Sequence, residues 1–226
     1  MDIDVLSLFP EYFEGPFRVS MIKRAIEKGL INIRLTNIRD FGEGKHRKVD
    51  DRPYGGGPGM VLMPGPACQA IRSVKRQDSH VVYLSPQGKL FNAKVAFRLA
   101  KLPHLVLICG HYEGLDERVI EQEVDEEISI GDYVLTNGCL ASIVLIDATA
   151  RFIPGVLGHE EATQYESFQQ GILEGPSYTR PEMFEGLEVP EVLKSGHHAD
   201  IEKWRMQKGL EKTERVRPEL VINDKK

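Results

Sequence analysis

The chain has 226 residues, of which 41% are hydrophobic, 28% charged and 8% aromatic. This balance excludes collagen-like, coiled-coil and wholly disordered proteins, and the length allows one large or two unequal domains. No apolar run approaches the roughly 20 residues that span a bilayer, and the N-terminus lacks the positive flank of a signal peptide. We therefore expect a cytoplasmic protein without a membrane partner.

The net charge of −5 is unevenly distributed. Residues 1–112 carry 17 basic and 10 acidic side chains, residues 113–191 carry 3 and 18, and residues 192–226 carry 9 and 6. Because Lys and Arg drive phosphate binding, the net charge alone argues against a nucleic-acid partner. The division permits two basic surfaces around an acidic middle, although a solvated acidic face is the commoner explanation of the middle block.

The first 152 residues alternate short apolar runs with amphipathic stretches, which predicts an α/β domain with a mainly parallel sheet. The predicted strands are residues 3–9, 31–38, 81–84, 105–109 and 127–130. The predicted helices are residues 18–28, 67–75, 93–101, 116–124 and 140–152, with a long charged loop at 39–64. Residues 142–146 taken alone fit a strand or a buried helix.

The character of the chain changes after residue 152. Residues 153–190 are rich in glycine, proline and glutamate, which indicates a linker or an extended surface segment. Residues 200–210 have helical spacing, with Ile201, Trp204 and Met206 near one face. We predict a first domain over residues 1–157, a linker over 158–175 and a small all-helical domain over 176–226.

Three loops stand where predicted strands end, at residues 85–88, 110–114 and 131–133. Ligands of open α/β sheets collect outside the carboxyl ends of the strands, so these loops are the first place to look for a site. The three cysteines, Cys68, Cys109 and Cys139, are an odd number at wide spacing. We therefore expect reduced, mostly buried thiols and no metal site.

Residues 50–60 form the least ordinary segment, with four glycines in five positions. Such a loop can cradle an anion through its N–H groups, but it is neither a Walker loop nor a dinucleotide fingerprint. The basic residues 45–48 precede it, and Tyr54 is available to stack on a base. A mobile loop beside a solvated charge run is the plainer explanation.

Two further residues, Arg151 and Glu166, have no distinctive signal in their local sequence. Arg151 ends an apolar helix, where the macrodipole favours a cation, and Glu166 lies in the linker. By themselves they indicate a capping arginine and a surface glutamate.

In order and spacing, several motifs resemble the bacterial tRNA (guanine-N1)-methyltransferases, members of the knotted SPOUT class. These motifs occupy residues 7–10, 50–60, 83–88, 109–119, 129–135, 151–158, 178–181 and 204–205. The resemblance covers nearly the whole chain. It implies a deep trefoil knot in the N-terminal domain, which is rare among folds, and an obligate homodimer whose active site is shared between subunits.

The implied reaction is methyl transfer from S-adenosylmethionine to N1 of guanosine 37, with the tRNA anticodon arm as partner; a role for Mg²⁺ stays open. By resemblance, the cofactor contacts residues of the three loops: Tyr83, Leu84, Ser85, Pro86, Gly110, Tyr112, Glu113, Ile130, Gly131, Asp132, Tyr133, Val134, Leu135 and Gly138. Glu166 takes the position of the general base, usually an aspartate, and Arg151 stabilises charge on O6 of the base.

The substrate-binding residues implied by the resemblance come from two segments. They are Arg39, Lys45, His46, Arg47, Asp50, Arg52, Tyr54, Gly55, Gly56, Gly57, Lys203 and Arg205. Two alternatives stay open. One is a knotted methyltransferase acting on a ribose hydroxyl or on ribosomal RNA, and the other is a non-catalytic RNA-binding module.

Overall fold

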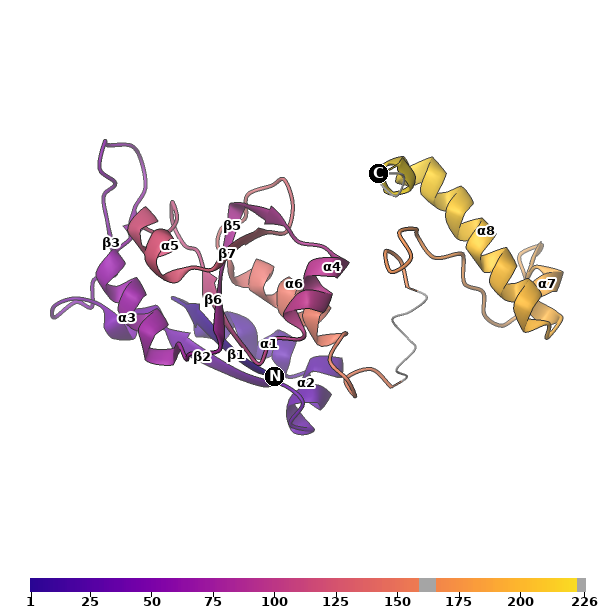
Figure 1. Cartoon of the computed structure of the whole chain (residues 1–226), viewed down its shortest axis with the longest axis horizontal. Helices are drawn as coiled ribbons and strands as arrows, with labels where there is room; N and C mark the ends of the chain where they lie inside the picture. The colour runs from indigo at the N-terminus through magenta and orange to yellow at the C-terminus, as the bar shows by residue number, and fades with distance from the viewer. Residues whose placement is uncertain (159–165, 223–226) are drawn as a thin grey trace. The chain divides into compact units, whose positions relative to one another are not determined.

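The computed structural model describes residues 1–158 and 166–222, which belong to two compact units (Figure 1). The first unit is Met1–Gly158 and the second is His159–Lys226. Part of the predicted linker, residues 159–165, lies outside the described residues. The predicted domain limits at 157 and 175 therefore stay predictions, and each unit is described by itself.

The first unit is built on a five-stranded sheet in which every neighbouring pair is parallel. The strand order is β2-β1-β6-β5-β7. The strands are β1 (Asp2–Ser7), β2 (Asn32–Asn37), β5 (Ser79–Leu90), β6 (His104–Cys109) and β7 (Glu126–Ser129). This confirms the predicted α/β class with a mainly parallel sheet.

Helices cover both faces of this sheet (Figure 1). One face carries η1 (Pro10–Phe13), α1 (Glu14–Phe17), α2 (Ser20–Glu27), α4 (Ala93–Leu99) and α6 (Cys139–Ala150). The other carries η2 (Ile38–Phe41), α3 (Pro64–Val74) and α5 (Glu117–Glu123). Along β6, Leu105 and Leu107 pack in the first layer, and Val106 and Ile108 in the second. Covering both faces explains the unbroken apolar run.

Side-chain hydrogen bonds begin two of the predicted helices. The Asn92 side chain accepts a hydrogen bond from the Val95 N–H at 3.1 Å and begins α4. Asp116 accepts one from the Arg118 N–H at 3.0 Å and begins α5. Residues 142–146, which also fitted a strand, belong to helix α6.

Two predicted boundaries in the first unit were wrong. Strand β5 does not end at Leu84, because it pairs with β7 again from Lys89 after a register shift. Residues 85–88 are therefore a bulge rather than a terminal turn. The predicted loop 39–64 contains η2 and a two-stranded antiparallel sheet, β3 (Asp50–Asp51) with β4 (Val61–Leu62). This small sheet closes the base of the glycine-rich loop.

The second unit contains a hairpin and three helices among its described residues. They are β8 (Met183–Phe184), β9 (Leu187–Glu188), α7 (Glu191–Lys194), α8 (His198–Val216) and α9 (Pro218–Ile222). The prediction of an all-helical unit was therefore wrong, because the unit also contains a short β-hairpin. Helix α8 is longer than the predicted helix over residues 200–210. In either unit, no helix in the described part combines the length and apolar character of a membrane span.

Candidate active site

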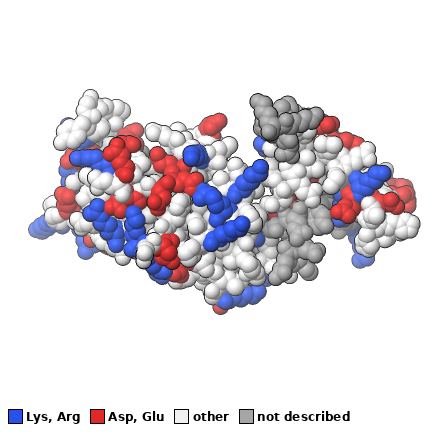
Figure 2. Space-filling view, in the orientation of Figure 1, with Lys and Arg blue, Asp and Glu red and all other residues white. Residues whose placement is uncertain are grey.

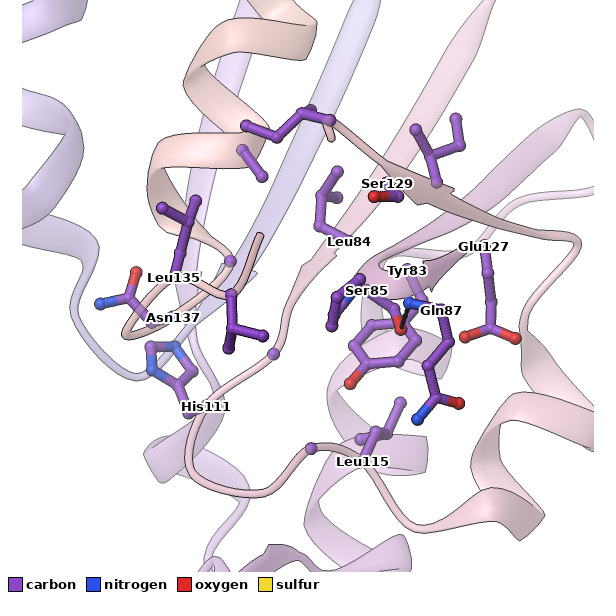
Figure 3. A pocket seen from close by; sticks show the side chains of 18 of the residues that line it. Tyr83, Leu84, Ser85, Gln87, His111, Leu115, Glu127, Ser129, Leu135 and Asn137 are labelled. Atoms are coloured by element: carbon purple, nitrogen blue, oxygen red, sulfur yellow. Dashed lines mark hydrogen bonds between the residues drawn. The ribbon is translucent and has the colours of Figure 1, made fainter. Parts of the chain in front are cut away.

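A cavity of about 310 Å³ lies at the bulge within β5 and at the carboxyl ends of β6 and β7 (Figure 3). It is lined by residues 83–87 of β5, residues 110–115 after β6, residues 127–138 apart from Asp132, and three residues of neighbouring helices, Glu117, Ile120 and Ala141. The predicted cofactor residues, all but Asp132, therefore line a single cavity. The cavity lies at the edge of the sheet to which the strand-end rule pointed.

A close backbone contact joins two of these walls. The Gly138 N–H donates to the Gly110 carbonyl at 2.7 Å. A Cβ at position 138 would lie 2.8 Å from the Gly110 nitrogen and 3.0 Å from the Cys109 Cα. Because these neighbours are backbone atoms, only glycine allows the segment after β7 to return so closely to the end of β6.

The cavity is acidic and partly apolar. Glu113, Glu117 and Glu127 line it, and among the described residues no Lys or Arg does. Leu84 and Leu135 supply apolar surface (Figure 3). This lining favours a ligand with a positive charge and a flat apolar part, and disfavours a phosphate.

Polar groups from three segments meet around His111, which lines the cavity. His111 is 4% exposed, and its Nε2 accepts a hydrogen bond from the Leu8 N–H at 3.3 Å. Ser7 Oγ lies 3.3 Å from that Nε2 and 3.2 Å from the Cys139 Sγ. Hydrogen bonds with Cys109, His111 and Ser7 lower the pKa of the Cys139 thiol below its usual value. The contact between Ser7 and Cys139 joins the end of β1 to the N-terminus of α6.

Several lining residues lie outside the predicted set. They are Gln87, His111, Gly114, Leu115, Glu117, Ile120, Glu127, Ile128, Ser129, Thr136, Asn137 and Ala141. Most adjoin the predicted ones within the same loops, so extending each motif by a few positions would have found them. Glu117 and Ile120 project from α5, and only the packing of that helix brings them to the cavity.

The predicted substrate residues of the first unit all lie between η2 and the glycine-rich loop. Arg39 belongs to η2, and Lys45, His46 and Arg47 form a turn closed by the Glu43–Lys48 bridge. Asp50 is in β3, and Arg52 follows it.

The glycine-rich loop beyond Arg52 is open. Tyr54 is 100% exposed, and a Cβ at Gly55, Gly56 or Gly57 would meet nothing within 4 Å. These positions are free to meet a partner.

Ion pairs offset part of the basic turn. Arg47 Nη1 lies 2.8 Å from Asp40 Oδ1, and Lys48 Nζ lies 2.7 Å from Asp51 Oδ2. Figure 2 shows Lys and Arg intermixed with Asp and Glu over the visible face of the first unit. The sequence-level charge blocks therefore do not become separate basic and acidic fields on this face.

The two predicted catalytic residues belong to different units. Arg151 caps the C-terminus of α6, as its place after the apolar run suggested. Glu166 lines a cavity of about 490 Å³ in the second unit, together with His198, Glu202 and Arg205. The structure thus brings predicted residues Glu166 and Arg205 to one cavity. Lys203 lies on the same helix, exposed, and is not part of that lining.

Over residues 1–158 and 166–222, no cluster of three or more His, Cys, Asp or Glu side chains is arranged to hold a metal ion. A role for Mg²⁺ stays a prediction. The three thiols in the described part are free, with Cys109 and Cys139 buried and Cys68 partly buried, as predicted.

Comparison with known proteins gives a consistent result. The family model described as tRNA (Guanine-1)-methyltransferase TrmD matches residues 1–223. A Protochlamydia amoebophila protein named tRNA (guanine-N(1)-)-methyltransferase is 61% identical over 221 residues, which cover 98% of this chain and 100% of that protein. Proteins of the same name from Chlamydia trachomatis serovar D and Chlamydia pneumoniae are 58% and 57% identical. These alignments cover 98% and 99% of this chain, but only 63% and 62% of those longer relatives.

Proposed function

Since the chain belongs to the tRNA (guanine-1)-methyltransferase family, we propose that it transfers a methyl group from S-adenosylmethionine to N1 of guanosine 37 in tRNA. The observation that carries this proposal is the strand-end cavity, which gathers the residues expected to hold the cofactor. The cytoplasm, where tRNA is found, is the proposed site of action.

The residues of the cavity fit this cofactor. S-adenosylmethionine, when bound, supplies a methyl group on a positively charged sulfur. Leu84, Ile130 and Leu135 offer apolar surface for an adenine ring, and Gly110 and Gly138 leave backbone groups within reach. The carboxylate of Glu113 has the charge that a sulfonium or an ammonium group requires.

Two residues carry the proton transfer and the charge. N1 of guanine holds a proton at neutral pH, so its attack on a methyl carbon needs an acceptor, and Glu166 has that role. Loss of the proton moves negative charge to O6, where the Arg151 guanidinium donates hydrogen bonds. Arg205, beside Glu166 in the second unit's cavity, is suited to a phosphate of the same nucleotide.

RNA binding uses exposed and basic side chains. Tyr54 stacks on a base, and Arg39, Lys45, Arg47 and Arg52 meet phosphates of the anticodon arm, as Lys203 does from the second unit. The target guanine leaves its stack to reach the cofactor. When RNA binds, a phosphate replaces Asp40 as the partner of Arg47, so the ion pair between these two residues breaks.

A homodimer with shared sites and a knotted first unit complete the proposal. Leu140 and Val144 on α6 are 45% and 46% exposed, and Tyr12 on the neighbouring η1 is 41% exposed. This apolar face suits a second copy of the chain. The return of the chain from β7 to the end of β6, where Gly138 bonds Gly110, is the course that a knotted strand connection would take.

The test is incorporation of labelled methyl groups into unmodified tRNA transcripts that differ only at position 37. We expect incorporation into the G37 transcript alone, with N1-methylguanosine as the product nucleoside. Label on a ribose, or equal labelling of an A37 transcript, would replace this function with the other knotted methyltransferase. Binding of tRNA with no cofactor affinity would indicate the non-catalytic module.

A further inference from the structure

Glu113 and Gly59 lie in unusually close contact, although 53 positions separate them in the sequence. A Cβ built on Gly59 would lie 2.2 Å from Glu113 Oε1, 2.4 Å from its Cγ and 2.7 Å from its Cδ. The Glu113 side chain therefore lies directly against the Gly59 backbone. Gly59 has a φ of +85°, a conformation that L side chains rarely adopt.

Backbone hydrogen bonds hold the two segments in this register. The Glu113 N–H donates to the Met60 carbonyl at 2.9 Å, and the Leu62 N–H donates to the Gly114 carbonyl at 2.9 Å. The Asp116 N–H then donates to the Leu62 carbonyl at 3.1 Å. The end of the glycine-rich loop is thus fixed to the loop at residues 110–114, while Gly55, Gly56 and Gly57 have open space around them.

We propose that Gly59 is a positioning residue, whose missing side chain leaves the space in which the Glu113 carboxylate is held at the cofactor cavity. This inference rests on the proposed function, since it assigns Glu113 to S-adenosylmethionine. The close atoms include Cγ, so a Cβ at position 59 cannot be avoided by moving the carboxylate tip alone. Glu113 has to adopt another rotamer, which takes its charge away from the ligand.

The test is the dissociation constant for S-adenosylmethionine, measured by calorimetry without RNA. We expect Gly59→Ala to weaken binding about tenfold, because one charge-assisted contact is lost. Gly29→Ala is the matched control, since Gly29 has a φ of +69° and a Cβ there meets nothing within 4 Å. It introduces the same kind of backbone strain at a glycine outside the proposed sites, and its cofactor affinity should equal that of the wild type.

A double-variant cycle separates positioning from general damage. Glu113→Ala removes the atoms that the new Cβ would meet, so Gly59→Ala should have no further effect in that background. Equal affinity of Gly59→Ala and wild type, or an undiminished effect in the Glu113→Ala background, overturns the inference. If the wild type itself fails to bind S-adenosylmethionine, the proposed function falls as well. Thermal unfolding of each variant confirms that the folded protein is compared.

Discussion

His104 Nε2 lies 2.7 Å from Asp4 Oδ2, and both side chains are buried between β1 and β6. Arg34 makes a two-pronged contact with the same carboxylate, with Nε 2.8 Å from Oδ1 and Nη2 2.6 Å from Oδ2. Burial opposes ionisation of Asp4, but hydrogen bonds from Arg34 and His104 lower the pKa of its carboxyl below the usual value. This cluster joins three neighbouring strands.

The lowered pKa of Asp4 predicts a loss of stability in acid. A carboxyl whose pKa is lower in the folded state contributes its full stability above the unfolded pKa of about 3.9, and loses it as the pH falls through the folded value. We expect Asp4→Asn to lower the free energy of unfolding by about 3 kcal/mol at pH 7 and to flatten its dependence on pH below 4. Urea titrations at several pH values measure both effects.

Asp2→Asn is the control for this cluster. Asp2 lies on the same strand but is 31% exposed in its ion pair with Arg76. Its replacement should cost less than about 1 kcal/mol. An equal loss in the free energy of unfolding for the two variants would show that burial of the Asp4 cluster adds nothing to its contribution to stability.

Gly138→Ala should weaken cofactor binding in a folded protein. The added Cβ meets backbone atoms of Cys109 and Gly110, so two cavity walls must separate. We expect affinity for S-adenosylmethionine to fall at least about tenfold, measured by calorimetry. Gly15→Ala, where a Cβ meets nothing within 4 Å, should leave the affinity unchanged. An unaltered affinity in Gly138→Ala would contradict the close approach described for these loops.

Glu166→Gln removes the proposed proton acceptor but keeps the size of the side chain. Turnover should fall by about 10²- to 10⁴-fold, with the cofactor dissociation constant unchanged. Glu174→Gln changes another glutamate of the same cavity and should retain most of the activity. Single-turnover methylation of G37 transcripts makes the comparison, and equal rates for Glu166→Gln and wild type would remove the assigned base.

Arg151→Ala tests charge stabilisation at O6. We expect turnover to fall by about 10²-fold, with little change in cofactor affinity. Arg151→Lys keeps the charge but loses the planar fork, and should restore part of the rate. If affinity and turnover fell equally in Arg151→Ala, the residue would be a binding group rather than a catalytic one.

Tyr54→Ala should weaken RNA binding without affecting the fold. The side chain is 100% exposed, so the change in stability should stay within about 0.5 kcal/mol. Loss of one stacked base should reduce tRNA affinity about tenfold, measured by filter binding at fixed salt. Tyr54→Phe keeps the ring and should bind like the wild type; equal weakening in both variants would exclude stacking.

Much of the fold follows from local pattern. Strand β6 could be predicted because both faces of the sheet are covered, which requires an unbroken apolar run. Strands β3, β4, β8 and β9 could not, since two residues are too short to show a period. The extension of β5 past Leu84 depends on a second pairing with β7, and the sequence of β5 alone does not predict that pairing.

The candidate site divides in the same way. The loops at residues 110–114 and 131–133 were predictable because strand ends gather ligands. The contact of Gly59 with Glu113 was not, because it depends on the pairing of Leu62 with Leu115 between distant segments. Family resemblance supplied the roles of Arg151 and Glu166, for which the local sequence has no signal.

The buried Asp4–His104 pair and the cavity lie at opposite ends of β6. In β6, His104 is the first residue, and Cys109, five residues later, is the last before the cavity loop. Hydrogen bonding to β1 and β5 makes this strand a rigid spacer of about 16 Å between its first and last residues. The cavity loops could therefore be exchanged to alter the ligand preference without changing the acid-sensitive Asp4–His104 pair at the other end of the strand.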